Sequence, residues 1–189
     1  MSRVLILYGT TEGQTAKVAR EMRAALEQRG FDVMTASADV MDPQPAAYDG
    51  VIVAASIHRG TYQKSVCQWV RAHAAALGAL PSVFVSVSLA VLQKDPKVDA
   101  ELAAIVARFA VETGWTPRET KHVAGALLYR NYNFLTRWVM KRIVAKAGGD
   151  TDTSRDYEYT DWADVRVFAE QFGRKVTTAS ARAVLAAAG

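Results

Sequence analysis

The chain has 189 residues, of which 50% are apolar and 22% are charged, with a formal net charge of +4 at pH 7. This length and composition predict one compact globular domain, and the single cysteine, Cys67, excludes a disulfide framework or a cysteine metal cluster. No apolar run is long enough to span a bilayer and no signal-peptide pattern precedes the first strand, so we expect a cytoplasmic protein that holds no metal.

Apolar strands alternate with helices along the chain. The predicted strands are 3–8, 31–35, 50–55, 82–87 and 121–127, and the predicted helices are 14–29, 61–77, 98–113 and 161–173. Because continuous apolar strands separated by helices are typical of a parallel sheet covered on both faces, we expect an α/β fold. The expected strand order is 2-1-3-4-5, with a ligand at the carboxyl ends of the strands.

The loop after the first strand is suited to a phosphate. It combines glycines with hydroxyl side chains, and a helix begins directly after it. Unpaired N–H groups at a helix N-terminus, together with the helix dipole, favour an anion there. Neither G-x-x-x-x-G-K-[ST] nor G-x-G-x-x-G occurs, which argues against a triphosphate loop and a dinucleotide fingerprint. The residues expected to bind the anion are Thr10, Thr11, Glu12, Gly13, Gln14 and Thr15.

This loop resembles the FMN-phosphate loop of flavodoxins. The family pattern is satisfied by Ile6, Leu7, Tyr8, Thr10, Gly13, Thr15 and Ala19. Met22 is a mild departure, because the pattern asks for Leu, Ile or Val at that position. The alternative is an ordinary strand-to-helix turn with a threonine N-cap. The resemblance implies a flavodoxin-like three-layer α/β/α sandwich that binds FMN.

Two further loops are expected to meet the phosphate loop at the same sheet edge. Their candidate cofactor contacts are Ser56, Ile57, His58, Arg59 and Gly60 after the third strand, and Ser86, Val87, Ser88 and Leu89 at the end of the fourth. In flavodoxins the loop after the third strand covers one face of the flavin ring, whereas here His58 and Arg59 could instead be solvated. His58 is the candidate catalytic residue, because imidazole changes charge near neutral pH.

A long segment separates the fifth strand from the last helix, at about 128–160. Gaps of this length are usually functional or disordered, and its several aromatic side chains argue against disorder. Its stretch 128–149 has no acidic residue and five basic ones, so the basicity of the chain is concentrated there: Arg130, Arg137, Lys141, Arg142 and Lys146. We call residues 128–160 the insertion.

Plotted as a helix, residues 134–147 of the insertion separate an apolar half from a basic half. The basic half suits an anionic membrane surface, and it suits the carboxylates of an acidic substrate equally well. A helix that packs its apolar half on the domain and solvates the rest is the third interpretation. The candidate substrate or membrane contacts are Arg130, Arg137, Trp138, Lys141 and Arg142.

Residues 3–172 as a whole resemble the flavodoxin-like, quinone-dependent protoporphyrinogen oxidases of bacterial haem synthesis. The matching pieces are the phosphate loop, 55–57 with Gly60 and Tyr62, 124–127, 148–153 and 159–162. The G-G-[DE]-T-D-T and Y-T-D-W segments are the specific ones, because plain flavodoxins lack them. The departures are His58-Arg59, where relatives are expected to have Arg-Tyr, and an alanine-rich tail, 174–189, which we expect to be mobile.

This resemblance implies an FMN-binding domain over 1–173 that oxidises protoporphyrinogen IX and passes electrons to menaquinone or ubiquinone. It further implies peripheral attachment to the cytoplasmic face of the inner membrane, allows an oligomer and gives no role to nucleic acid. The alternatives are a flavodoxin-type electron carrier or another FMN-dependent quinone reductase, and a flavin-free module that binds through its basic face. Flavodoxins are usually strongly acidic, so the net charge of +4 argues against the carrier.

Overall fold

The computed structural model describes residues 1–127 and 156–187, and every structural statement below concerns these two segments. The strands are β1 (Arg3–Gly9), β2 (Asp32–Ser37), β3 (Gly50–Ser56), β4 (Ser82–Ser88), β5 (Thr120–Ala124), β6 (Ala126–Leu127) and β7 (Tyr157–Glu158). The helices are α1 (Gln14–Gln28), α2 (Lys64–Ala79), α3 (Pro96–Thr113) and α5 (Trp162–Ala187), with 3-10 turns η1 (Pro45–Ala47) and η2 (Leu89–Gln93).

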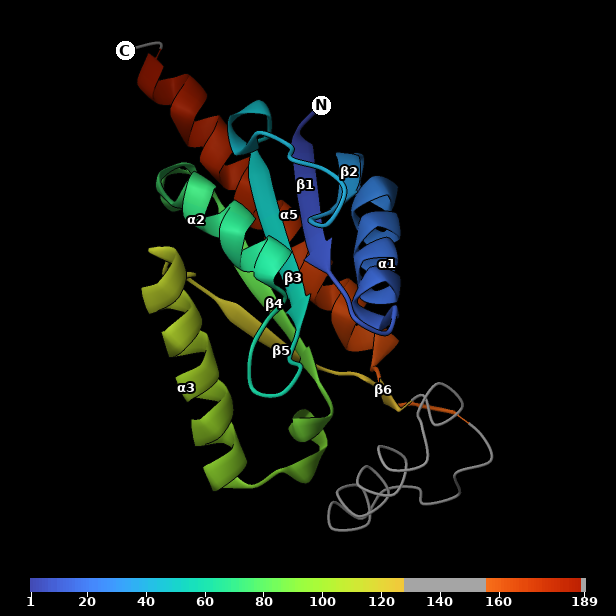
Figure 1. Ribbon diagram of the computed structural model, residues 1–189. Coiled ribbons are helices and arrows are strands. Elements are labelled where there is room, and N and C mark those ends of the chain that lie inside the picture. Colours follow the sequence, from blue (N-terminus) through green and yellow to red (C-terminus); the bar gives the residue numbers. More distant parts are fainter. Residues whose placement is uncertain (128–155, 188–189) are drawn as a thin grey trace.

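Strands β1 to β5 form one parallel sheet in the order β2-β1-β3-β4-β5, which confirms the predicted topology. Because successive side chains of a strand point to opposite faces, β1 contributes Val4 and Ile6 to one core and Leu5 and Leu7 to the other. Helices α1 and α5 cover the first core, and α2 and α3 cover the second, which gives three layers (Figure 1). The carboxyl ends of the strands share one edge, away from the two termini (Figure 1).

The fifth strand is shorter than predicted, and the second half of 121–127 leaves the sheet. The last pair of the β4–β5 ladder joins Ser88 to Ala124, and β4 ends there. Beyond it no neighbouring strand remains, so Ala126–Leu127 pairs antiparallel with Tyr157–Glu158 instead. Residues 128–155 of the insertion therefore lie, in sequence, between two strands that form a small second sheet.

The predicted end of the last helix at Gly173 is wrong, because α5 continues to Ala187. A Cβ at Gly173 would lie 2.8 Å from Phe31 Cε2 and 3.0 Å from Leu26 Cδ2, so the glycine permits a close approach inside the helix. Val176, three residues further, is fully buried. The mobile tail expected from residue 174 thus begins as ordered helix, and mobility of its last residues stays a prediction.

The contact between α5 and β3 gives a test of this correction. Gly50→Ala should lower the free energy of unfolding by about 1–3 kcal/mol, because the added Cβ would lie 2.4 Å from Val176 Cγ2 and 3.0 Å from Phe172 Cζ. Urea denaturation measures the change. Gly78→Ala in α2 is the matched control, since nothing lies within 4 Å of its Cβ and it should be neutral or stabilising by about 0.5–1 kcal/mol. Equal stability of the two variants would contradict the packing.

Candidate functional site

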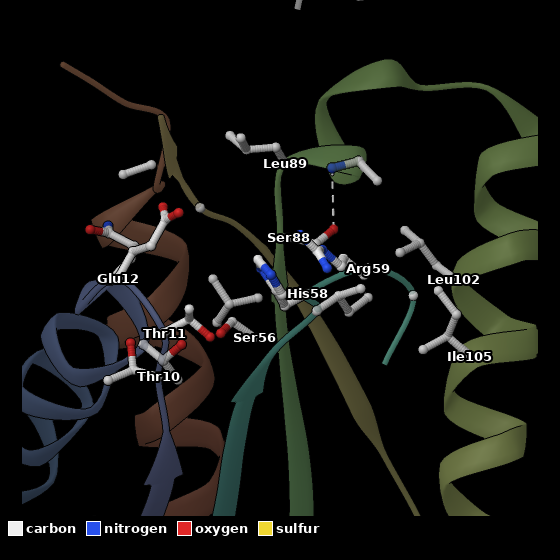
Figure 2. A pocket seen from close by; sticks show the side chains of 18 of the residues that line it. Thr10, Thr11, Glu12, Ser56, His58, Arg59, Ser88, Leu89, Leu102 and Ile105 are labelled. Atoms are coloured by element: carbon white, nitrogen blue, oxygen red, sulfur yellow. Dashed lines mark hydrogen bonds between the residues drawn. The ribbon is translucent and has the colours of Figure 1, made fainter. Parts of the chain in front are cut away.

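A cavity of about 750 Å³ opens at the carboxyl ends of β1, β3 and β4. Figure 2 shows its walls: Thr10, Thr11 and Glu12 lie on one side, and Leu102 and Ile105 of α3 lie on the opposite side. The loop after β3 runs between them, with the end of β4 behind it. The cavity therefore lies where the strand-end rule places a ligand in an open α/β sheet.

Thirteen of the fifteen predicted cofactor contacts line this cavity, and Gly13 and Ser86 do not. Those that do are Thr10, Thr11, Glu12, Gln14, Thr15, Ser56, Ile57, His58, Arg59, Gly60, Val87, Ser88 and Leu89. Gly13 instead turns the backbone, and the buried Ser86 hydroxyl hydrogen-bonds the Tyr62 hydroxyl at 2.8 Å. The remaining lining residues were not predicted from the sequence; they are Ala90, Gln93, Val98, Glu101, Leu102, Ile105, Gly125 and Ala126.

The phosphate loop is built around Gly13. Its φ of 87° is in the left-handed region that glycine adopts without strain, and its N–H donates to Thr10 Oγ1 at 2.9 Å. Helix α1 then begins at Gln14 with no side-chain cap on its first N–H groups. Gln14 and Thr15 line the cavity, so an anion bound at this end of it would satisfy these N–H groups.

Thr15 supplies the sharpest sign that this wall binds something. Its side chain is fully buried and lines the cavity, yet Oγ1 has no hydrogen-bond partner among the described residues. A buried hydroxyl without a partner is costly, so native proteins rarely leave one unsatisfied. A phosphate oxygen at the start of α1 would accept from Thr15 and from the backbone together, so these residues fit the phosphate group of FMN.

The loop after β3 is a tight turn that faces the cavity. His58 and Thr61 bond each other in both directions, His58 N to Thr61 O at 2.8 Å and Thr61 N to His58 O at 3.1 Å. Arg59 and Gly60 between them have φ values of 51° and 77°, as in a type I′ turn. Arg108 of α3 donates to Gly60 O at 3.1 Å. The turn therefore holds His58 at the cavity (Figure 2), between the phosphate loop and Ser88.

One residue outside the lining, Gln63, ties the two loops together. Its Nε2 donates to Thr11 Oγ1 at 3.0 Å and to Ser56 Oγ at 2.7 Å, and its Oε1 accepts from Ser56 N at 3.2 Å. Gln63 is the residue before α2, which begins at Lys64 and not at Thr61 as predicted. A polar side chain directly before a helix was the available signal, but only the fold shows which loops it reaches.

Tyr62, the residue before Gln63, makes the stability of the protein sensitive to high pH. Burial raises its pKa to about 12, against an opposing effect of the Ser86 hydrogen bond. The pKa is higher folded than unfolded, so this stabilisation is complete below about pH 10 and is lost as the pH rises toward 12. Between these values unfolding should become easier by about 1.4 kcal/mol per pH unit from this group.

Urea denaturation of the wild type and Tyr62→Phe at pH 9 and pH 11 tests this assignment. Phe cannot titrate, so the variant should lose less stability than the wild type between the two pH values. The variant is expected to be about 1 kcal/mol less stable at pH 9, because Ser86 loses its partner. Identical pH dependence of the two proteins would contradict the raised pKa.

The predicted contacts of the insertion, Arg130, Arg137, Trp138, Lys141 and Arg142, lie outside the described residues. Of the insertion, residues 156–160 are described; they contain β7, which pairs with β6, and Gly125 and Ala126 at the start of β6 line the cavity. Within residues 1–127 and 156–187, no helix is long and apolar enough to cross a membrane.

Comparisons with known proteins agree with this geometry. Residues 5–154 match the model of a family described as a flavodoxin domain. The protoporphyrinogen IX dehydrogenase [quinone] of Escherichia coli K12 is 34% identical over 89% of this chain and 93% of its own length. The enzyme of that name from Leishmania major is 34% identical over 90% of this chain and 74% of its own.

Among solved structures, oxidised flavodoxin 1 of Bacillus cereus superposes with a TM-score of 0.53. The superposition covers 92% of this chain and 98% of the flavodoxin, and the two sequences are 12% identical. A likeness at this identity concerns the fold alone, and it agrees with the sheet order found here.

Proposed function

The chain belongs to the flavodoxin-domain family and, within it, to the quinone-dependent protoporphyrinogen IX dehydrogenases, and from this membership we propose that it oxidises protoporphyrinogen IX to protoporphyrin IX with FMN and a quinone. The structural observation that carries the FMN part of the proposal is the fully buried Thr15 hydroxyl at the start of α1, which has no partner among the described residues and lies in a cavity built from the strand-end loops. An oxidoreductase of this kind needs a bound cofactor as well as a substrate site, and the cavity offers a phosphate cradle at one end.

Different residues along the cavity would contact different parts of FMN. The first turn of α1, with Thr15, would hold the phosphate, while the loop from Ser56 to Gly60 and the residues Ser88 and Leu89 would hold the flavin ring. Bound FMN supplies the hydride-accepting chemistry. Oxidation of a porphyrinogen releases a hydride from carbon and a proton from nitrogen, and an imidazole nitrogen of His58, which lines the cavity, would take the proton.

Steady-state turnover of the purified protein tests the proposal. FMN-loaded protein should show flavin absorbance, and addition of protoporphyrinogen IX with a soluble quinone should produce porphyrin fluorescence faster than buffer does. The matched control is the same preparation stripped of FMN, which should regain its rate when FMN is restored. Flavin absorbance without turnover would favour the electron carrier or a reductase of another substrate, and a protein that binds no flavin would contradict the proposal entirely.

We also propose that the insertion supplies substrate or membrane contacts and that the protein attaches peripherally to the cytoplasmic face of the inner membrane. The support is the sequence of the insertion, because quinones reside in lipid and basic residues mixed with aromatic ones suit an anionic surface. The macrocycle also carries two carboxylates that basic residues can bind.

Neutralising four of these basic residues together should separate the two roles from FMN binding. The quadruple Gln variant of Arg130, Arg137, Lys141 and Arg142 should raise KM or weaken binding to anionic vesicles by roughly 100-fold or more, since each charge near such a surface contributes about 1 kcal/mol. Flavin absorbance should be unchanged. The matched control is the quadruple Gln variant of exposed residues elsewhere, Arg20, Arg23, Arg71 and Arg118. Normal KM and normal vesicle binding in the insertion variant would refute the assignment.

A further inference from the structure

A polar cluster, buried at Gln14 and Thr160 and exposed at Glu158 and Lys17, joins the phosphate loop to the small sheet at the base of the insertion. Gln14 Nε2 donates to Glu158 Oε1 at 2.6 Å and to Thr160 Oγ1 at 2.8 Å, across more than 140 residues of sequence. Thr160 in turn donates to Ala124 O at 2.7 Å, and Lys17 Nζ lies 3.3 Å from the same Glu158 oxygen. Gln14 is only 7% exposed and Thr160 only 9%, so water cannot easily replace the bond between these two side chains.

Backbone bonds extend the same connection into the cavity wall. Tyr159 N donates to Gly125 O at 3.1 Å, and Gly125 N donates to Ser88 O at 3.3 Å. Glu158 pairs with Ala126 across the β6–β7 ladder. The base of the insertion is thus attached on one side to α1 and on the other to the loop after β4, both of which line the cavity.

The position of Gln14 gives this cluster a role beyond holding the fold together. It is the first residue of α1, so its backbone N–H belongs to the turn that would bind a phosphate, while its side chain is already committed to β7. Both N–H bonds of the amide nitrogen are used by the two acceptors. Fixing the backbone of Gln14 therefore fixes its side chain, and with it Glu158 and Thr160.

The charges around Gln14 also favour a neutral amide at this position. Glu158 would place a negative charge beside the phosphate, and Lys17 lies within ion-pair distance of that carboxylate. The neutral side-chain amide of Gln14 donates to the Glu158 carboxylate, while the backbone N–H of Gln14 belongs to the first turn of α1. An acidic residue at position 14 would bring two carboxylates together and repel the phosphate, and an apolar residue would leave the buried Thr160 hydroxyl without its donor.

We propose that Gln14 is a positioning residue that couples occupation of the phosphate site to the placement of β6 and β7 at the rim of the cavity. The coupling rests on the FMN binding proposed above, but it does not depend on which substrate the enzyme oxidises. Through the Gln14 side chain, the cofactor end of the cavity is connected to β6 and β7, the strands that lead into and out of the insertion. Because coupling is reciprocal, the factor by which FMN favours the ordered strands equals the factor by which the ordered strands tighten FMN binding, so loss of the contact should weaken both effects.

Hydrogen exchange followed by mass spectrometry, with and without saturating FMN, tests the coupling. In the wild type, FMN should slow amide exchange in peptides that cover 124–127 and 156–160. In Gln14→Leu, which keeps the size of the side chain but not its donors, most of this slowing should disappear, and the Kd for FMN should rise roughly fivefold or more. Glu21→Gln is the matched control, because Glu21 ties α1 to α5 through Arg166 at 2.6 Å, away from the cavity, and should leave the slowing intact.

A second variant, Thr160→Val, tests whether Gln14→Leu acts only by disturbing the phosphate loop, to which Gln14 itself belongs. It removes the acceptor for Gln14 and the donor to Ala124 O but leaves Gln14 in place, so it should also reduce the slowing. Equal FMN-dependent slowing in the wild type, Gln14→Leu and Thr160→Val would overturn the proposal, as would an absence of slowing in a wild type that binds FMN. If the wild type bound no FMN at all, the proposed function itself would fail, and flavin fluorescence shows which of the two has happened.

Discussion

Thr15→Val should raise the Kd for FMN by roughly 10- to 100-fold. Valine has nearly the shape of threonine and removes only the hydroxyl, which is fully buried and has no partner in the described part of the chain. A hydrogen bond to a charged group contributes about 1.5–3 kcal/mol, and a dianionic phosphate is such a group. The same substitution should stabilise the FMN-free protein or leave it unchanged, because it removes a polar atom that is unsatisfied there.

This opposite pair of effects is what distinguishes a ligand-binding threonine from a structural one. Titration of the FMN-free protein, followed by quenching of flavin fluorescence, gives the Kd, and urea denaturation without FMN gives the stability. Thr15→Ser should retain wild-type affinity within a few-fold, since it keeps the hydroxyl. Thr177→Val in α5 is the matched control, because the Thr177 hydroxyl bonds only its own helix, at Gly173 O. Unchanged FMN affinity in Thr15→Val would place the phosphate elsewhere.

Gln63→Leu should lower both stability and FMN affinity. The substitution removes three hydrogen bonds at once and leaves the Ser56 N–H, a half-buried donor, without its acceptor. At about 1 kcal/mol for each bond lost, and more for the unpaired donor, the free energy of unfolding should fall by roughly 2–4 kcal/mol. FMN affinity should fall as well, because Thr11 and Ser56 lose the side chain that fixes their separation.

Urea denaturation and an FMN titration measure the two losses separately. Gln28→Leu at the exposed end of α1 is the matched control for the change in side chain, and it should leave both quantities near wild type. If saturating FMN restored the stability of Gln63→Leu fully, the residue would act only in the FMN-free protein. A stability loss with no change in FMN affinity would show that Gln63 does not set the geometry of the site.

The part of the site that could be predicted from sequence is the part that local pattern determines. Thr10 to Thr15 follow a strand and open a helix, so their position needs no knowledge of distant contacts. The loops at Ser56 and Ser88 were found because parallel strands end at one edge. Ser86 was expected in the site but lies two residues before the end of β4, where its buried hydroxyl is hydrogen-bonded to the Tyr62 hydroxyl.

The opposite wall could not be predicted in the same way. Leu102 and Ile105 are ordinary apolar positions of an amphipathic helix, and which of them faces a cavity depends on how α3 packs over β4 and β5. Gln14 was assigned to the phosphate loop correctly, but its second role needs Glu158 and Thr160, which are distant in sequence. No periodicity encodes a contact of that kind.

Two glycines show where local rules gave the wrong element boundary. The last helix was predicted to end at Gly173, but this glycine is explained by close packing against Leu26 and Phe31, and α5 continues beyond it. Gly125 lies within an apolar run that predicts a single strand, although the chain changes sheets there because β4 has ended. In both cases the neighbouring element decided the outcome and not the intrinsic preference of the residue.

The central claim is that this cavity, loaded with FMN, passes electrons from protoporphyrinogen IX to a quinone. The most direct measurement is porphyrin fluorescence under strictly anaerobic conditions, where oxygen cannot oxidise the substrate. With FMN-loaded protein and catalytic amounts of enzyme, we predict sustained porphyrin formation only after a soluble quinone is added, and a lower rate for Thr15→Val that excess FMN restores. Porphyrin formation that needs no quinone, or that proceeds equally well with FMN-free protein, would contradict the account.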